Sequence, residues 1–176
     1  MKNLPRLAFL LCLLVIVAGP TRAADLAQHP VFKHYLGQWS AEGELKNANG
    51  EPVKIKEDWT GSADGENSFT LKGTRTINGD TQPFTWTFTH NPATDTYEAV
   101  HVGNDPSQAL RFEANVSEVT TTIDLKAITG TSGSVAVVEK FTDNKFETLA
   151  SEITFTNDQG MKTLEGTIMH KKVKGP

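Results

Sequence analysis

The sequence predicts an all-β protein, an antiparallel up-and-down barrel of about ten strands with a short N-terminal helix that closes one end. Three observations predict this fold. From Trp39 onward, apolar and polar residues alternate, as they do in strands that bury one face. Short turns rich in Asn, Asp and Gly separate the alternating segments. No long helical pattern interrupts the series, which excludes a parallel βαβ architecture.

A β-sandwich is the alternative arrangement of the same segments. Its Greek-key topology needs longer crossing connections, and the sequence shows none. Closure into a barrel also removes the exposed edges through which open sheets associate. We therefore favour the barrel, which at this strand number can enclose one small ligand.

Residues 1–23 have the three parts of a secretory signal peptide. Lys2 and Arg6 form the basic end, an apolar run follows, and small residues surround Ala23. The apolar run is short for a bilayer span, so we expect a removed signal peptide rather than a retained anchor. The prediction is an exported protein, periplasmic or extracellular, with one domain over residues 24–176 and no membrane insertion after cleavage.

Composition excludes several classes of function. The single cysteine, Cys12, lies in the expected signal peptide, so the mature chain has no disulfide, thiolate metal ligand or cysteine nucleophile. Three of the 17 Lys and Arg also lie there, which leaves 14 against 21 Asp and Glu. A chain this acidic repels phosphate backbones and anionic lipid, so we expect neither nucleic acid nor a membrane surface as partner.

The segment before the first strand is expected to form the closing helix. Pro30 suits a first helical position, and apolar residues recur at helical spacing between Val31 and Leu36. His29 and His34 flank this piece without the i,i+4 spacing of a helical ligand pair, so we expect both to be solvated.

The strands follow from the alternation. In the fifth, either Tyr97, Ala99 and His101 face inward, or Val100 and Val102 do. The expected segments, in order, are 39–45, 53–59, 69–75, 84–90, 97–102, 110–114, 119–127, 135–141, 149–155 and 164–170.

Two short motifs carry a family resemblance. Gly37-Gln38-Trp39, at the junction of helix and first strand, resembles the Gly-x-Trp signature of the calycin superfamily, which includes lipocalins and fatty-acid-binding proteins. Continued to Gly43, it is also similar to the opening of nitrobindin-like haem barrels. The run from Phe84 to Val102 resembles secreted bacterial calycin-like domains without an assigned function. The resemblance implies a ten-stranded barrel that holds a cavity in some members and packed side chains in others.

The mature chain has two arginines, Arg75 and Arg111. Arg75 continues an apolar face, so it either orients a ligand's polar head or pairs with a glutamate such as Glu57 or Glu139. The predicted ligand-binding set consists of aromatic residues for the cavity wall, one histidine and both arginines: Trp39, Trp59, Phe69, Arg75, Trp86, Phe88, His101 and Arg111.

Catalytic and metal motifs are absent from the sequence: it has no nucleophile elbow, zinc-binding helix, phosphate loop or dinucleotide fingerprint. His90 and His101 lie too far apart along a hairpin to hold one ion, and no metal site is predicted. His170 resembles the late-strand haem ligand of nitrobindin-like proteins, but a histidine at a strand end is usually solvated. Glu57 and Glu139 form an acid–base pair only if the fold brings them together. We expect instead that each lies at the rim of the barrel or in a salt bridge.

Three functions are compatible with these features. The first, which we favour, is an exported carrier or sensor that binds a small apolar or amphipathic molecule. The second is a structural or protein-interaction module of the cell envelope with a filled barrel. The third is a haem-dependent enzyme; no other cofactor is expected. Oligomeric state does not follow from the sequence.

Overall fold

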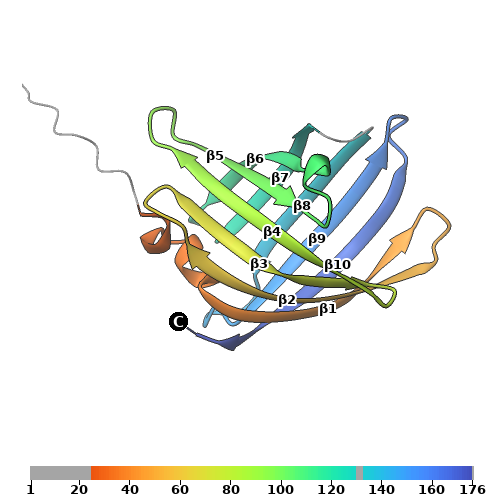
Figure 1. Cartoon of the computed structure of the whole chain (residues 1–176), viewed down its shortest axis with the longest axis horizontal. Coiled ribbons are helices and arrows are strands. Elements are labelled where there is room, and N and C mark those ends of the chain that lie inside the picture. Colours follow the sequence, from red (N-terminus) through yellow and green to blue (C-terminus); the bar gives the residue numbers. More distant parts are fainter. Residues whose placement is uncertain (1–24, 130–132, 176) are drawn as a thin grey trace, which may run out of the picture.

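The computed structural model describes residues 25–129 and 133–175 (Figure 1). The expected signal peptide, residues 1–23, lies outside the described residues. The described chain forms one closed antiparallel barrel in which every strand pairs with its neighbours in sequence, and the first strand pairs with the last. The ten strands are β1 (Gly37–Asn47), β2 (Pro52–Ala63), β3 (Ser68–Ile77), β4 (Asp80–Asn91), β5 (Thr96–Val102), β6 (Leu110–Ser117), β7 (Thr122–Thr129), β8 (Gly133–Phe141), β9 (Thr148–Asn157) and β10 (Lys162–Lys174).

The prediction of a closed ten-stranded meander is therefore confirmed. Alternation determines which side chains face inward, and in β8 every second residue from Val135 to Phe141 is buried. In β5 the set that contains Ala99 faces inward, because Ala99 is fully buried opposite Phe88 and Phe112. The expected start of the seventh strand is wrong: Val119 lies in the turn before β7 and is almost fully exposed.

The predicted N-terminal helix is also wrong. Two short 3-10 turns replace it, η1 (Leu26–Gln28) and η2 (Phe32–Tyr35). His29 separates them in an extended conformation, with φ −60° and ψ 136°. A residue before proline is driven out of the helical region by the proline ring, so Pro30 interrupts the helical pattern instead of starting a helix.

The two turns still close one end of the barrel, at the left of the view in Figure 1. Phe32 is fully buried and its ring contacts the rings of Phe69 and Phe88, with centroids 5.7 and 5.3 Å apart. Trp39 stacks on Trp59 at 5.2 Å, and its indole nitrogen donates a 3.1 Å hydrogen bond to the carbonyl oxygen of Tyr35. We call these aromatic residues, together with Tyr35 and Phe141, the aromatic plug.

Neither histidine of the N-terminal segment is solvated as expected. His29 is buried, where its Nδ1 accepts from the Val31 amide at 3.2 Å and its Nε2 lies 3.2 Å from the hydroxyl of Tyr97. His34 is half-buried and stacks on Phe146, with ring centroids 3.6 Å apart. Burial, above all, lowers the pKa of both imidazoles. Both side chains therefore anchor the N-terminal turns to the barrel.

The outer surface is mostly polar. Outward positions of β1 and β2 include Glu42, Glu44, Lys54 and Lys56, and those of β4 are largely threonines. Large apolar side chains are exposed at separate positions on turns and strands, such as Met161 and Val173. Among the described residues, no helix has the length and apolar character needed to cross a membrane.

Candidate ligand-binding site

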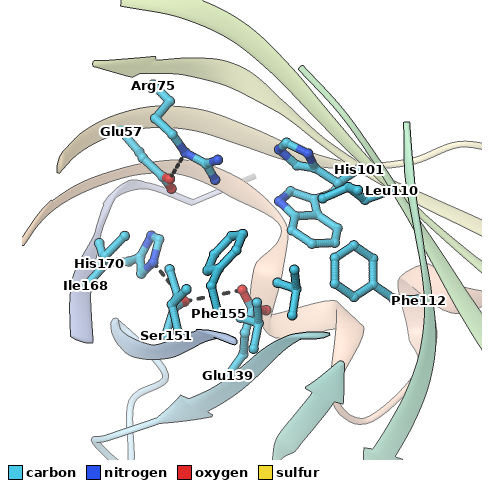
Figure 2. A pocket seen from close by; sticks show the side chains of 14 residues that line it. Glu57, Arg75, His101, Leu110, Phe112, Glu139, Ser151, Phe155, Ile168 and His170 are labelled. Atoms are coloured by element: carbon cyan, nitrogen blue, oxygen red, sulfur yellow. Dashed lines mark hydrogen bonds and ion pairs between the residues drawn. The ribbon is translucent and has the colours of Figure 1, made fainter. Parts of the chain in front are cut away.

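Beyond the aromatic plug, the barrel interior contains a pocket that is partly open to solvent and has a cavity volume of about 90 Å³. Figure 2 shows the polar side chains Glu57, Arg75, Ser151 and His170 on one side and the ring of Phe112 on the other. The complete lining is contributed by β2 to β6 and β8 to β10: Glu57, Arg75, Trp86, His101, Leu110, Phe112, Val135, Val137, Glu139, Ser151, Ile153, Phe155, Ile168 and His170.

The apolar wall is built around Trp86, which is half-buried in β4. Its ring centroid lies 5.0 Å from that of Phe112 on β6 and 4.7 Å from that of His101 on β5. These three residues meet because β4, β5 and β6 are consecutive and their inward positions are in register, with Trp86 opposite His101. The wall contributes aromatic rings to the pocket lining, which suit a planar or apolar ligand.

On the polar side, Arg75 and Glu57 form a close ion pair. They are direct partners across β2 and β3, and Arg75 Nε donates to Glu57 Oε1 at 2.5 Å. The guanidinium lies over the ring of Phe84, 4.9 Å from its centroid, and the arginine side chain keeps 24% exposure against 5% for the glutamate. No hydrogen bond within the described chain engages the two terminal nitrogens of Arg75, so they remain available to a ligand.

A directed chain of hydrogen bonds runs deeper along the same side. Trp59 Nε1 donates to His170 Nδ1 at 3.1 Å, and His170 Nε2 lies 2.9 Å from Ser151 Oγ. Ser151 Oγ in turn donates to Glu139 Oε1 at 3.3 Å. An indole nitrogen can only donate, so Nδ1 of His170 must accept and the proton of the neutral ring resides on Nε2. Every bond in the chain therefore points towards Glu139.

This direction determines what His170 and Ser151 can do. The imidazole donates to Ser151 instead of accepting its proton, so His170 cannot act as the general base that a serine nucleophile needs. Burial lowers the pKa of His170 to about 4, with Glu57 opposing and Arg75 adding to that shift. The ring is thus neutral at pH 7, and the pair serves to position Glu139 rather than to catalyse acyl transfer.

Glu139 is the one lining carboxyl without a basic partner in the described structure. Burial raises its pKa to about 7, against the lowering effect of contacts with Tyr35 and Ser151 and with a further rise from Glu57. Tyr35 interacts with Glu139 outside ordinary hydrogen-bond geometry, so Tyr35 Oη and Glu139 Oε2 are both buried without a hydrogen bond. A buried polar atom without a partner is costly and is often satisfied by a bound ligand or water.

His101 is a further lining residue, on β5. Burial, assisted by the charge of Arg75, lowers its pKa to about 4, so the ring is neutral at pH 7. Its Nε2 is buried and has no hydrogen-bond partner in the described chain. A neutral imidazole can donate or accept at this atom, depending on the tautomer that a ligand selects.

The predicted ligand-binding residues separate into three groups. Arg75, Trp86 and His101 line the pocket. Arg111 is exposed on the outer face of β6. The remaining four are buried in the aromatic plug behind the pocket: Trp39, Trp59, Phe69 and Phe88.

Sequence reasoning underestimated four polar residues. The pairing of Arg75 with Glu57 is confirmed, and with it a salt-bridged position for Glu57. Glu139 has no basic partner in the described chain, and it lines the same pocket as Glu57. His170, expected in solvent, is 4% exposed. Ser151 was not singled out at all. The alternation of inward and outward positions was the signal available in the sequence, because each of these residues occupies an inward position of its strand.

The residues present do not fit haem at His170. Both of its ring nitrogens are engaged, by Trp59 and Ser151, so iron would have to displace one of these bonds. Within residues 25–129 and 133–175, no group of three or more His, Cys, Asp or Glu lies close enough to hold a metal ion.

No protein-family model matches the chain, and no curated protein sequence does either. Solved structures do match. The S-type phycobiliprotein lyase CPES from Guillardia theta superposes with a TM-score of 0.57 at 9% identity, over 82% of this chain and 92% of that chain. Rv2717c from M. tuberculosis superposes with a TM-score of 0.57 at 14% identity, over 85% and 98%. A redesigned β-barrel, mFAP1, bound to DFHBI, gives a TM-score of 0.43 at 12% identity, over 81% and 99%. At such identities, the likeness to the first two establishes the barrel fold alone.

Proposed function

We propose that this chain is an exported binding protein whose barrel holds one small apolar or amphipathic molecule, as a carrier or sensor. The observation that carries the proposal is the pocket itself. It lies inside the barrel and is partly open to solvent. Aromatic and aliphatic side chains make most of its wall, and a few polar groups converge on one side. This combination is typical of pockets that bury a ligand's body and orient its polar end.

We also propose that the barrel belongs to the calycin superfamily. Gly37 adopts φ +104°, and its missing side chain lets β1 approach the C-terminal backbone, where a Cβ would lie 2.4 Å from the carbonyl oxygen of Lys174. Trp39, two residues later, is part of the aromatic plug. The lyase activity in the name of the Guillardia protein is not transferred to this chain, because 9% identity relates the folds only.

Two observations weigh against the alternatives. A structural module with a filled barrel would have no pocket, and its binding face would be a contiguous apolar patch. Here the exposed large apolar side chains are scattered over a polar exterior. Haem iron at His170 would need a free ring nitrogen, and both nitrogens of His170 are already bonded.

The proposal is tested by mass spectrometry under non-denaturing conditions, on the full-length protein produced in an exporting host. Two variants on β8 form a matched pair: Val137→Phe fills the pocket, whereas Val138→Phe adds the same ring to the outer surface. We expect a bound small molecule in the wild type and in Val138→Phe but not in Val137→Phe. Wild-type protein that retains no molecule and takes up none from a panel of apolar and amphipathic compounds would overturn the proposal.

A further inference from the structure

The charges inside the pocket do not balance. Three lining residues can carry charge at neutral pH, Glu57, Arg75 and Glu139, because His101 and His170 are neutral. Arg75 and Glu57 neutralise each other at 2.5 Å. The ionised Glu139 is then a single negative charge in a buried site without a counter-ion, an arrangement that proteins avoid.

The groups packed around Glu139 offer it donors but no positive charge. On β9, Ser151 donates to Oε1, and His170 on β10 supports that serine. On η2, Tyr35 presents a neutral hydroxyl, and Ile123 on β7 is the apolar partner across the strand pair. From β2, Glu57 adds a second negative charge, which raises the pKa of Glu139 further. The missing interaction partner of Glu139 is therefore a cation.

The aromatic side chains of the lining also favour a cation. Trp86, Phe112 and Phe155 present aromatic rings to the pocket, and the faces of such rings attract organic cations. An anionic ligand could reach the terminal nitrogens of Arg75 but would also meet two acidic side chains, Glu57 and Glu139. The acidic composition of the chain also disfavours the binding of anions.

We propose that the ligand of this pocket is an organic monocation, a protonated amine attached to an apolar or aromatic body, and that its binding displaces a proton from Glu139. The inference rests on the proposed binding function and adds the charge of the ligand to it. The charge balance is simple: the protonated amine enters, the Glu139 carboxyl loses its proton to solvent, and the net charge of the pocket does not change.

The test compares three compounds of similar shape: phenethylamine as the cation, phenethyl alcohol as the neutral analogue and phenylacetate as the anion. Isothermal titration calorimetry on the full-length protein measures their affinities at about pH 6 and pH 8, in two buffers that differ in ionisation enthalpy. We expect phenethylamine to bind most tightly, with affinity about tenfold higher at pH 8 because the pKa of Glu139 lies near 7. Proton release should accompany binding at the lower pH.

A matched pair of variants isolates Glu139. Glu139→Gln keeps an acceptor for Ser151 but removes the buried charge, whereas Glu152→Gln removes an exposed carboxylate from the outer face of β9. The preference for the amine and its pH dependence should disappear in Glu139→Gln and persist in Glu152→Gln. Binding of the alcohol or the acid in preference to the amine would overturn the inference and leave the binding function intact. Failure of all three compounds to bind would count against both.

Discussion

At the scale of single residues, Trp59 determines the direction of the hydrogen bonds on the polar side of the pocket. Its indole N–H donates to His170 Nδ1, which places the histidine proton on Nε2 and turns the following bonds towards Glu139. The tryptophan does not line the pocket, yet it determines the donor and acceptor pattern that a ligand meets. It acts on the site through His170 as a positioning residue.

Substitution Trp59→Phe should release this constraint. Nitrogen NMR of the imidazole should show wild-type His170 as the Nε2–H tautomer and the variant as a mixture of tautomers, because Nδ1 loses its donor. The control is Trp39→Phe, since the Trp39 indole donates to the Tyr35 carbonyl and not to His170. If the His170 tautomer is unchanged in Trp59→Phe, or changes equally in the control, the proposed direction of the hydrogen bonds is contradicted.

Glu139 gives stability a distinct pH dependence. Its pKa is about 7 when folded, against 4.5 in a model peptide, so between these values the folded chain holds a proton that the unfolded chain has lost. Its contribution to stability is therefore complete below about pH 4.5 and is lost as pH rises through about 7. His101 and His170 act in the opposite direction, because their pKa values are lowered from 6.5 to about 4. As pH falls through this range, the unfolded imidazoles bind protons that the folded ones do not, so stability falls.

Denaturation of Glu139→Gln should separate the two effects, because both histidines remain. Relative to wild type, the variant should have similar stability at acidic pH and gain up to about 3 kcal/mol at about pH 8. Urea unfolding across this pH range measures the difference, with Glu152→Gln as the control for loss of an exposed carboxylate. A constant offset at all pH values would show that Glu139 does not titrate in the folded protein.

At the scale of elements, the β2–β3 pair positions the ion pair at the pocket. Gly73 faces inward in β3, where a Cβ would lie 2.0 Å from the carbonyl oxygen of Asp58 and 2.6 Å from Cα of Trp59. Both neighbouring atoms belong to the backbone of β2, so they cannot rotate away. Close approach of the two strands therefore depends on glycine at this position.

Substitution Gly73→Ala should push β2 and β3 apart and destabilise the fold by roughly 1–3 kcal/mol, as overpacking typically does. Gly103→Ala is the matched control, because its Cβ would meet only the ring of His101 at 4.0 Å. Urea midpoints of the two variants compare the effects. Equal stability of Gly73→Ala and Gly103→Ala would mean that the strands tolerate a wider separation.

The elements also show where sequence patterns suffice. Period-two alternation and polar turns predicted the strands, because each strand buries one face and its pattern is local. The prediction of an N-terminal helix was wrong because it followed the helical spacing of apolar residues and neglected the effect of Pro30, which holds His29 in an extended conformation. Burial of His29 and His34 was missed because their partners, Tyr97 and Phe146, are distant in sequence.

At the scale of the whole molecule, barrel closure brings the site together. Glu57, Glu139 and His170 are on β2, β8 and β10, and only closure of β1 on β10 brings them to one pocket. The sequence predicted that these residues share apolar faces, but their neighbours across the barrel depend on register and curvature. Arg75, Trp86 and His101 were predicted because large or charged side chains at inward positions are recognisable one strand at a time.

The central claim is that a small molecule binds inside the barrel, and methyl NMR tests it most directly. Titration of methyl-labelled protein with phenethylamine or phenethyl alcohol should shift the signals of Val137, Ile153 and Ile168 and leave those of Val119 and Val138 unchanged. The first three line the pocket, and the last two lie on the outside. Shifts confined to the outer methyl groups, or none at saturating concentrations, would contradict the account.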